Sequence, residues 1–356
     1  MIAPYTAVGL VTTVWGVRRR SEIQRNIDHI SHVIAAASWL SSLSLPVRLV
    51  AIPEGALQGF TDEVFDSDHE EYATECAIDV PGAETDALGE LARKWNVFIM
   101  AQAKARHESF PGRFFNMGFV LDPSGQVILK HYKLATLYPV EHSVTPHDVW
   151  DRWVELHGET LDAFYPVVDT EIGKLGVMMA NEASYPENAR GLAMNGAEVT
   201  YRASYPHPHT GNDYFEIQNR ARALDNNFYV VAPNLATYYL EQDSDVPIDT
   251  FGGRSMIVDY RGRIVGKHLY GAGSSYVAGV IDVEALRDHR ARAQWDNWMK
   301  DLRTEQYKMI YDRPIYPKNL YLDRAPYRHE EFRREVIEKQ VKKMHDEGIW
   351  TPPSPK

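Results

Sequence analysis

The chain has 356 residues, of which 44% are hydrophobic and 24% are charged, so it can bury a large core in one or two domains. Its formal net charge of −11 argues against general binding to nucleic acid or to anionic lipid. No apolar run approaches the roughly 20 residues needed to cross a bilayer, and no secretory signal is evident. The single cysteine, Cys76, cannot form an intrachain disulfide. We therefore expect a cytoplasmic protein with no membrane or nucleic-acid partner.

The first part of the chain alternates apolar strands with amphipathic helices. One helix is indicated by apolar residues at helical spacing from Ile23 to Ile34. The turn at 122–125 joins two apolar segments and predicts a hairpin. In chain order the expected elements are a strand over 5–15, a helix from Ile23, a strand over 47–52 that ends on Pro53 and Glu54, a helix over 84–95, and strands over 97–103, 114–121 and 126–130.

Residues 134–163 show little periodicity, and we expect a long loop there, of a length that is usually functional or disordered. The chain beyond it again alternates strands and helices, which predicts a mixed sheet covered by helices. The segment 301–356 is rich in charges, tyrosines and prolines and cannot build its own core. The expected elements are strands over 164–169, 174–180, 197–202, 228–233, 255–259, 263–268 and 276–282, and helices over 186–195, 212–226, 283–300 and 329–346.

Three charged residues stand where a sheet delivers side chains to a pocket. Glu54 follows a buried strand, Lys133 stands at the end of another, and Glu141 lies eight residues further on. None of the three is specific alone. The ordinary interpretations are a solvated acid in a turn for Glu54, a surface lysine for Lys133 and an acid in a loop for Glu141. A fourth position, Ala180, lies where an apolar strand turns into a helix that opens at Pro186. Such an elbow is a common place for a nucleophile, yet alanine offers only a methyl group.

The joint arrangement of these residues resembles the glutamate–lysine–cysteine triad of the nitrilase superfamily of carbon–nitrogen hydrolases. The matching segments include Ala51–Glu54, Leu129–Leu134, Leu175–Glu187, Asn188–Glu198 and Arg220–Asn234, and the resemblance spans about residues 5–300. The segment Tyr138–Glu141 and the long tail are similar to the aliphatic amidase and formamidase branch. The family's cysteine falls on Ala180, and its usual aspartate is Glu182. A deliberate Cys→Ala substitution that silences the enzyme would explain Ala180, and a natural pseudoenzyme is the alternative.

The resemblance implies an amidohydrolase that acts on a neutral amide without a cofactor. A thiol at position 180 would form a thioester, Glu54 would move protons, and Lys133 with the backbone N–H of Asn181 would stabilise the oxyanion. Glu141 would hold the amide nitrogen. The substrate's tail would contact the loops 138–150 and 203–211, in which Tyr138 and Tyr205 are candidate contacts. A nitrilase and an N-carbamoyl amidohydrolase remain alternatives, as does a non-catalytic binder of an amide or a protein partner.

Two other segments contain residues that could bind a ligand. Arg202 could serve a substrate carboxylate, although a structural, ion-paired arginine is the preferred interpretation. His207 and His209 lack a spaced third ligand, so we expect no metal site there. As the resemblance implies, we expect a four-layer αββα sandwich over 1–300, a C-terminal arm over 301–356 that packs on the body or on a partner subunit, and a homo-oligomer of even number.

Overall fold

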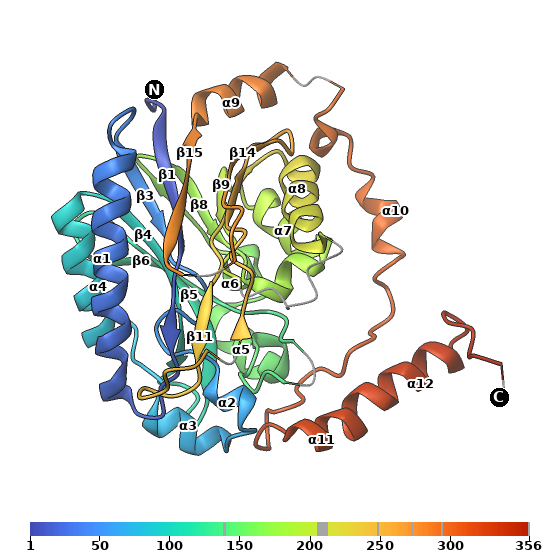
Figure 1. Cartoon of the computed structure of the whole chain (residues 1–356). Helices are drawn as coiled ribbons and strands as arrows, with labels where there is room; N and C mark the ends of the chain where they lie inside the picture. Colours follow the sequence, from blue (N-terminus) through green and yellow to red (C-terminus); the bar gives the residue numbers. More distant parts are fainter. Residues whose placement is uncertain (138–139, 205–212, 248, 272, 293–294, 355–356) are drawn as a thin grey trace.

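The computed structural model describes the chain except for residues 138–139, 205–212, 248, 272, 293–294 and 355–356. Two six-stranded sheets pack face to face between two pairs of helices (Figure 1). Helices α1 (Ile23–Ser41) and α4 (Ala83–Trp95) cover one sheet, and α7 (Pro186–Met194) and α8 (Tyr214–Asn226) cover the other. This arrangement confirms the predicted αββα sandwich.

The first sheet brings the ends of two functionally important strands to one edge. Its order is β15-β1-β3-β4-β5-β6, in which β1, β3 and β4 are mutually parallel and the remaining pairs are antiparallel. Strand β6 therefore runs in the same direction as β3, so the residues that follow both strands emerge at the same edge. The bounds are β1 Tyr5–Val11, β3 Val47–Ala51, β4 Phe98–Arg106, β5 Phe114–Leu121, β6 Val127–Tyr132 and β15 Ser275–Ile281.

The second sheet has the order β14-β13-β10-β9-β8-β7, with the three strands β8, β9 and β10 parallel at its centre. Strand β8 leads directly to Ala180, and β9 leads to Arg202. The bounds are β7 Val167–Thr170, β8 Gly173–Val177, β9 Val199–Tyr201, β10 Tyr229–Ala232, β13 Met256–Val258 and β14 Ile264–Lys267.

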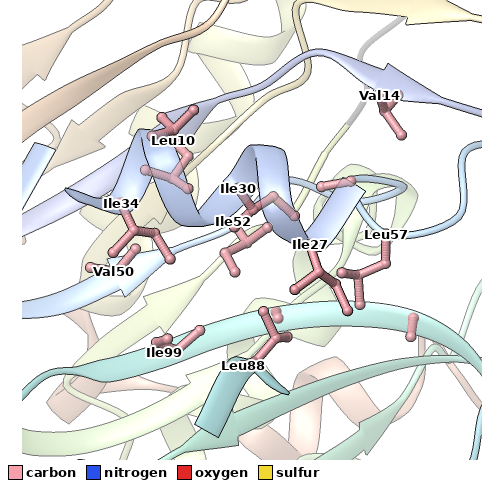
Figure 2. Packing of buried hydrophobic residues seen from close by; sticks show 14 of the residues in the cluster. Leu10, Val14, Ile27, Ile30, Ile34, Val50, Ile52, Leu57, Leu88 and Ile99 are labelled. Atoms are coloured by element: carbon pink, nitrogen blue, oxygen red, sulfur yellow. The ribbon is translucent and has the colours of Figure 1, made fainter. Parts of the chain in front are cut away.

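Apolar side chains fill each of the three spaces between the layers. The cluster between α1, α4 and the first sheet includes Ile27, Ile30 and Ile34 of the predicted helical face (Figure 2). A second cluster joins the two sheets, and a third lies under α7 and α8. The sheets approach closely at Gly118 of β5, where an added Cβ would lie 2.5 Å from Val177 Cγ1. A glycine at this position therefore lets the strand before the elbow pack against the first sheet.

Several predicted boundaries are wrong. The expected strand 5–15 breaks after Val11, and Val14–Trp15 (β2) joins a separate small sheet with β11 (Thr237–Tyr239) and β12 (Asp249–Thr250). The expected loop 134–163 contains the helices α5 (Trp150–His157) and α6 (Leu161–Phe164). The helix expected over 283–300 ends earlier, as α9 (Val283–Arg292). Two short helices, α2 (Thr61–Val64) and α3 (His69–Glu75), were not predicted.

The C-terminal segment leaves the body after α9 (Figure 1). It returns to the body at His147 and Asp148, whose backbone oxygens accept from the N–H groups of Asn319 and Tyr321. It contains α10 (Thr304–Lys308), α11 (His329–Phe332) and α12 (Glu338–Asp346), the last two joined by a π-helical turn. Tyr321, Phe332 and Val336 are buried in one cluster with Phe115 and Trp153 of the body. No helix in the described part of the chain is long and apolar enough to span a bilayer.

Candidate active site

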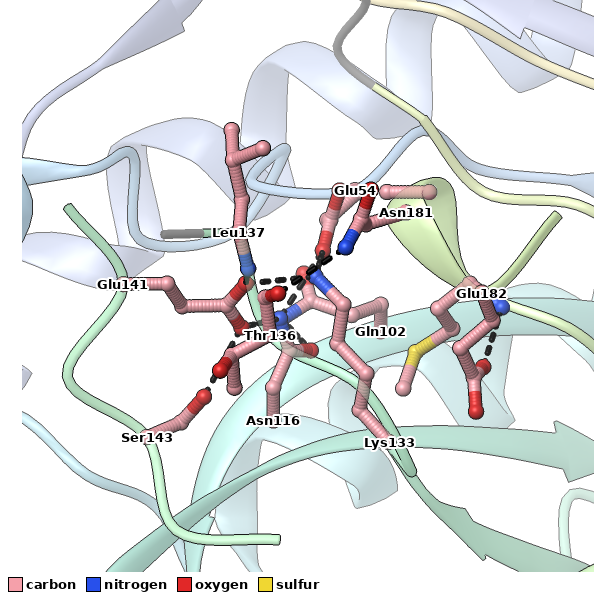
Figure 3. Close-up of polar contacts among 12 residues, drawn as sticks. Glu54, Gln102, Asn116, Lys133, Thr136, Leu137, Glu141, Ser143, Asn181 and Glu182 are labelled. Carbon is pink, nitrogen blue, oxygen red and sulfur yellow. Dashed lines mark hydrogen bonds and ion pairs between the residues drawn. The ribbon is translucent and has the colours of Figure 1, made fainter. Parts of the chain in front are cut away.

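A buried lysine lies between two buried carboxylates at the shared edge of β3 and β6. Lys133 Nζ donates to Glu54 Oε1 at 2.9 Å and to Glu141 Oε2 at 2.8 Å (Figure 3). The three side chains are at most 1% exposed. The structure thus brings together three of the residues that the sequence singled out, although they are up to 87 positions apart in the chain.

Asn116 is a fourth member of this network, and the sequence analysis missed it. Its Nδ2 donates to Glu54 Oε1 at 2.8 Å and to Glu141 Oε1 at 2.9 Å. Gln102 on β4 orients it through a 2.7 Å bond to Asn116 Oδ1 and accepts the backbone N–H of Gly55. A polar amide inside an otherwise apolar strand was the available signal, because buried polar groups need partners.

Glu141 is held by two further donors from its own loop. Leu137 donates its backbone N–H to Oε2 at 3.0 Å, and the Ser143 hydroxyl donates to Oε1 at 2.8 Å. Both carboxylate oxygens are therefore occupied by hydrogen bonds or by the lysine. Glu54 differs, because its Oε2 is buried and makes no hydrogen bond among the described residues. That oxygen is the acceptor which a general base needs.

The charges in this network shift the pKa values in different directions. Burial raises the pKa of the Glu54 carboxyl, Lys133 opposes this shift, and the nearby Glu141 adds to it. Burial also disfavours the charged forms of Lys133 and Glu141, but their mutual attraction outweighs it. The pKa of Lys133 is raised and the pKa of Glu141 is lowered. Of the two carboxylates, Glu54 is therefore the one that more readily takes up a proton.

The elbow at Ala180 has a strained backbone. Ala180 has a φ of +34°, a region that side chains with a Cβ rarely adopt. Its N–H donates to Ala203 O at 2.6 Å, which ties the elbow to the residues beyond β9. A 3₁₀ turn over Ala180–Ser184 then leads to Pro186, the first residue of α7. Strain of this kind is typical of positions that present a reactive side chain.

Glu182 fastens the elbow to the Lys133 segment. Its carboxylate accepts the backbone N–H of Met179 at 2.6 Å, that of Leu134 at 2.8 Å, and His131 Nε2 at 3.0 Å. Glu182 is fully buried, so these bonds compensate for its desolvation. The substitution of the family's usual aspartate by Glu182 thus leaves an acid that clamps β6 to the elbow.

Asn181 lies beside the same segment. Its side-chain Nδ2 donates to Thr136 O at 2.9 Å, while its backbone N–H has no hydrogen-bond acceptor in the part of the chain that the structure describes. The neighbouring N–H groups of Ala180 and Glu182 are both occupied, the latter by Met179 O. Asn181 N–H is thus the donor of the elbow that a ligand could use.

Arg202 is 2% exposed and is held by the protein itself. It donates to Asn219 Oδ1 at 2.8 Å, to Gln218 Oε1 at 2.7 Å and to Ala180 O at 3.2 Å. The predicted structural role is therefore correct, but the predicted ion pair is wrong for the described residues, because these acceptors are neutral. Tyr138 and Tyr205, the two candidate substrate contacts, and the pair His207 and His209 lie outside the described residues.

The sequence model of the carbon–nitrogen hydrolase family matches residues 8–288. This match covers most of the chain, so the protein belongs to the carbon–nitrogen hydrolase family, and the predicted resemblance to the nitrilase superfamily is confirmed.

Curated relatives and solved structures agree with this assignment. Formamidases of Bacillus cereus (strain AH820) and Bacillus anthracis are 28% identical over 224 residues, which are 62% of this chain and 59% of theirs. Three solved structures share the fold. A carbon–nitrogen hydrolase of Helicobacter pylori G27 has a TM-score of 0.65 at 18% identity and covers 87% of this chain and 99% of its own. Saccharomyces cerevisiae Nit3 gives 0.62 at 21% identity, covering 82% and 95%. An amidase of Nesterenkonia sp. gives 0.62 at 17% identity, covering 86% and 96%.

Proposed function

We propose that this fold hydrolyses the carbon–nitrogen bond of a neutral amide when a thiol stands at position 180. The observation that carries the proposal is the buried Glu54–Lys133–Glu141 network, which the Glu182 bonds hold against the strained elbow. Membership of the family and the formamidase relatives support the same reaction class.

In the proposed mechanism the thiol sulfur attacks the amide carbon while Glu54 Oε2 takes the thiol proton. The carbonyl oxygen becomes an oxyanion, which Lys133 Nζ and the Asn181 N–H stabilise. The carbon–nitrogen bond then breaks, and Glu54 gives its proton to the leaving ammonia. In the second half, Glu54 takes a proton from water, whose hydroxide attacks the thioester. The carbon–sulfur bond then breaks and Glu54 returns its proton to the sulfur, which releases the acid and restores the thiol.

The chain with Ala180 has no sulfur for the first step, so we propose that it is inactive by this route. Loss of the nucleophile from a unit of interdependent residues removes several orders of magnitude in turnover. A Cys→Ala substitution at position 180 would nevertheless leave the network of Glu54, Lys133 and Glu141 intact. A Cys-to-Ala mutant of the Nesterenkonia sp. AN1 amidase was solved in complex with butyramide, and we propose that this chain likewise retains an unreacted amide.

A neutral primary amide is the preferred substrate. When both are ionised, Glu54 and Glu141 carry two negative charges against the one positive charge of Lys133, which disfavours a free carboxylate. Glu141 already accepts four hydrogen bonds, so an amide NH₂ group would donate to it by displacing one of these donors. Arg202 is already engaged by neutral acceptors, which weighs against its use for the carboxylate of an N-carbamoyl amino acid. A nitrile remains a second candidate, because the same thiol and acid would serve it.

We also propose that the subunits associate through the face formed by α7, α8 and the C-terminal arm. Exposed apolar side chains lie on all three, namely Met194, Ile217, Met309 and Ile310. In this proposal residues 1–300 form the catalytic body, and residues 301–356 form an arm that packs on the body or on a partner subunit. Light scattering at micromolar concentration should give a dimer or a larger even assembly, and a stable monomer would contradict it.

The function is tested by ammonia release from the Ala180→Cys variant with formamide, acetamide, butyramide, nitriles and N-carbamoyl amino acids. We expect turnover of simple amides, and its loss in the double variant Ala180→Cys/Glu54→Gln. The unmodified chain is the control for Cys76, which is buried and whose pKa burial raises to about 12. Silence across the whole panel, with amide binding retained, would favour the non-catalytic alternative.

A further inference from the structure

One acid and two histidines meet at the junction of three distant segments. Asp66 follows α2, His142 follows Glu141 directly, and His329 begins α11 of the C-terminal segment. One ligand atom from each residue lies within 4.8 Å of the other two. This set of atoms is separate from the Lys133 network, because His142 is the neighbour of Glu141 in sequence but contacts neither Lys133 nor Glu54 among the described bonds.

The distances within this cluster suit a small divalent cation. Asp66 Oδ1 lies 3.1 Å from His142 Nε2 and 3.8 Å from His329 Nε2. Two donors bound about 2.0–2.1 Å from a tetrahedral Zn²⁺ are roughly 3.4 Å apart, so the two observed separations bracket the expected one. His329 Nε2 donates a 3.0 Å hydrogen bond to the backbone oxygen of Val140, and binding of a cation would replace the proton of this bond.

His142 provides an independent indication of a ligand. The residue is 4% exposed, and its Nε2 is buried without a hydrogen-bond partner among the described residues. It lies 3.1 Å from Asp66 Oδ1, but the two groups do not have the geometry of a hydrogen bond. Buried polar atoms are normally satisfied, so a nitrogen left open toward an aspartate and a second histidine is typical of a metal ligand.

We propose that Asp66, His142 and His329 bind one divalent cation of the Zn²⁺ class. Two imidazoles and one carboxylate suit Zn²⁺ better than Mg²⁺ or Ca²⁺, which prefer oxygen donors. The fourth position falls to the Val140 carbonyl or to a water molecule.

The cation would fasten the C-terminal segment to the loop that carries Glu141. At present α11 is held there by a 3.1 Å bond from the His329 backbone N–H to Asp66 Oδ1 and by the packing of Phe332 and Val336. Zinc ligands from two loops and α11 would join these segments through coordinate bonds. Removal of the cation should therefore loosen the segment beyond residue 303 before the sandwich itself unfolds.

The test is Zn²⁺ binding by the full chain after treatment with a chelator. Calorimetric titration with ZnCl₂ should give one site, and Mg²⁺ should give no heat of binding. His329→Ala and Asp66→Asn should each weaken Zn²⁺ binding at least tenfold, whereas His32→Ala, on the exposed face of α1, should leave it unchanged. Far-ultraviolet circular dichroism confirms that each variant is folded, and the half-buried Asp66 provides a second variant if His329→Ala does not fold.

Limited proteolysis provides a second measurement, because adventitious Zn²⁺ binding elsewhere on the surface would not change the rate at which the C-terminal segment is cleaved. Zn²⁺ should slow cleavage within residues 303–356 in the unmodified chain and in His32→Ala, but not in His329→Ala. The proposal is overturned if the unmodified chain binds no Zn²⁺, or if both ligand variants bind it as tightly as the unmodified chain. Neither result depends on amide hydrolysis, so the proposed function would stand or fall separately.

Discussion

Replacing Lys133 by methionine tests whether the buried ammonium holds the two carboxylates in place. Methionine preserves most of the apolar stem but removes the charge, which leaves Glu54 and Glu141 buried with no cation between them. Removal of one member of a buried ionic group typically costs about 3–5 kcal/mol. This cost is limited if one carboxylate of the variant becomes protonated. For a glutamate with an ordinary pKa, protonation at pH 7 requires about 3.4 kcal/mol of free energy.

The loss should be visible as a lower melting temperature. An unfolding entropy of about 2.1 cal/mol/K per residue, applied to 356 residues, converts about 3–5 kcal/mol into a fall of about 4–7 °C. Differential scanning fluorimetry or calorimetry measures this change. Lys130→Met is the matched control, because Lys130 lies on β6, the strand that Lys133 directly follows, with its side chain exposed, and we expect a shift below about 1 °C.

The pH dependence tests the cause. Without Lys133 the pKa of the Glu54 carboxyl in the folded protein rises further above its value in the unfolded chain. The protonated Glu54 therefore contributes to folding stability at low pH, and this contribution is lost as the pH rises. The stability gap between Lys133→Met and the unmodified chain should therefore narrow between pH 7 and pH 5, by up to about 1.4 kcal/mol per pH unit for each carboxylate. An unchanged melting temperature, or a gap that is equal at both pH values, would refute this reasoning.

Three further predictions concern the residues around the network. In the Ala180→Cys background, Asn116→Leu should lower kcat for acetamide at least tenfold while the melting temperature stays within a few degrees, since it removes bonds to both acids; an unchanged kcat would contradict this. Glu182→Ala should lower the free energy of unfolding in urea by about 2–4 kcal/mol, because two buried donors and one half-buried donor lose their acceptor. A change below about 0.5 kcal/mol, which is usual for a surface substitution, would argue against this role of Glu182. Burial raises the pKa of Asp148 to about 6, so the stability that this group contributes is lost as the pH rises from about 4 to 6. The difference in stability between Asp148→Asn and the unmodified chain should therefore shift in favour of the variant between pH 4 and pH 7.5. Parallel pH profiles of the two proteins would contradict this prediction.

The catalytic positions were predictable because each has a strong local context. Glu54 comes three residues after a short buried strand, Lys133 directly follows the second strand of a hairpin, and Ala180 precedes a proline-initiated helix. These local contexts can be recognised in the sequence without knowledge of the tertiary structure. Asn116 and Gln102 lie in the middle of apolar strands, where a polar residue gives no indication of which distant group it will bind.

The missed elements depend on tertiary packing. Helix α5 has no long apolar stripe, and it is stabilised by Trp153, which is buried against Phe110 and Phe115 of the body. The strand expected over 5–15 is almost continuously buried, so burial cannot reveal that β1 and β2 pair with different partners. The contact between His329 and Asp66 joins positions 263 residues apart, and local sequence patterns give no indication of it.

The most direct test of the proposed mechanism is intact-protein mass spectrometry of the Ala180→Cys variant. After brief incubation with butyramide and an acid quench, we predict a mass increase of one acyl group at position 180, which hydroxylamine removes, and no adduct on the unmodified chain. If the introduced thiol can be alkylated by iodoacetamide yet never acquires an acyl group from any amide, position 180 does not share a reaction site with Glu54 and Lys133, and the account is wrong.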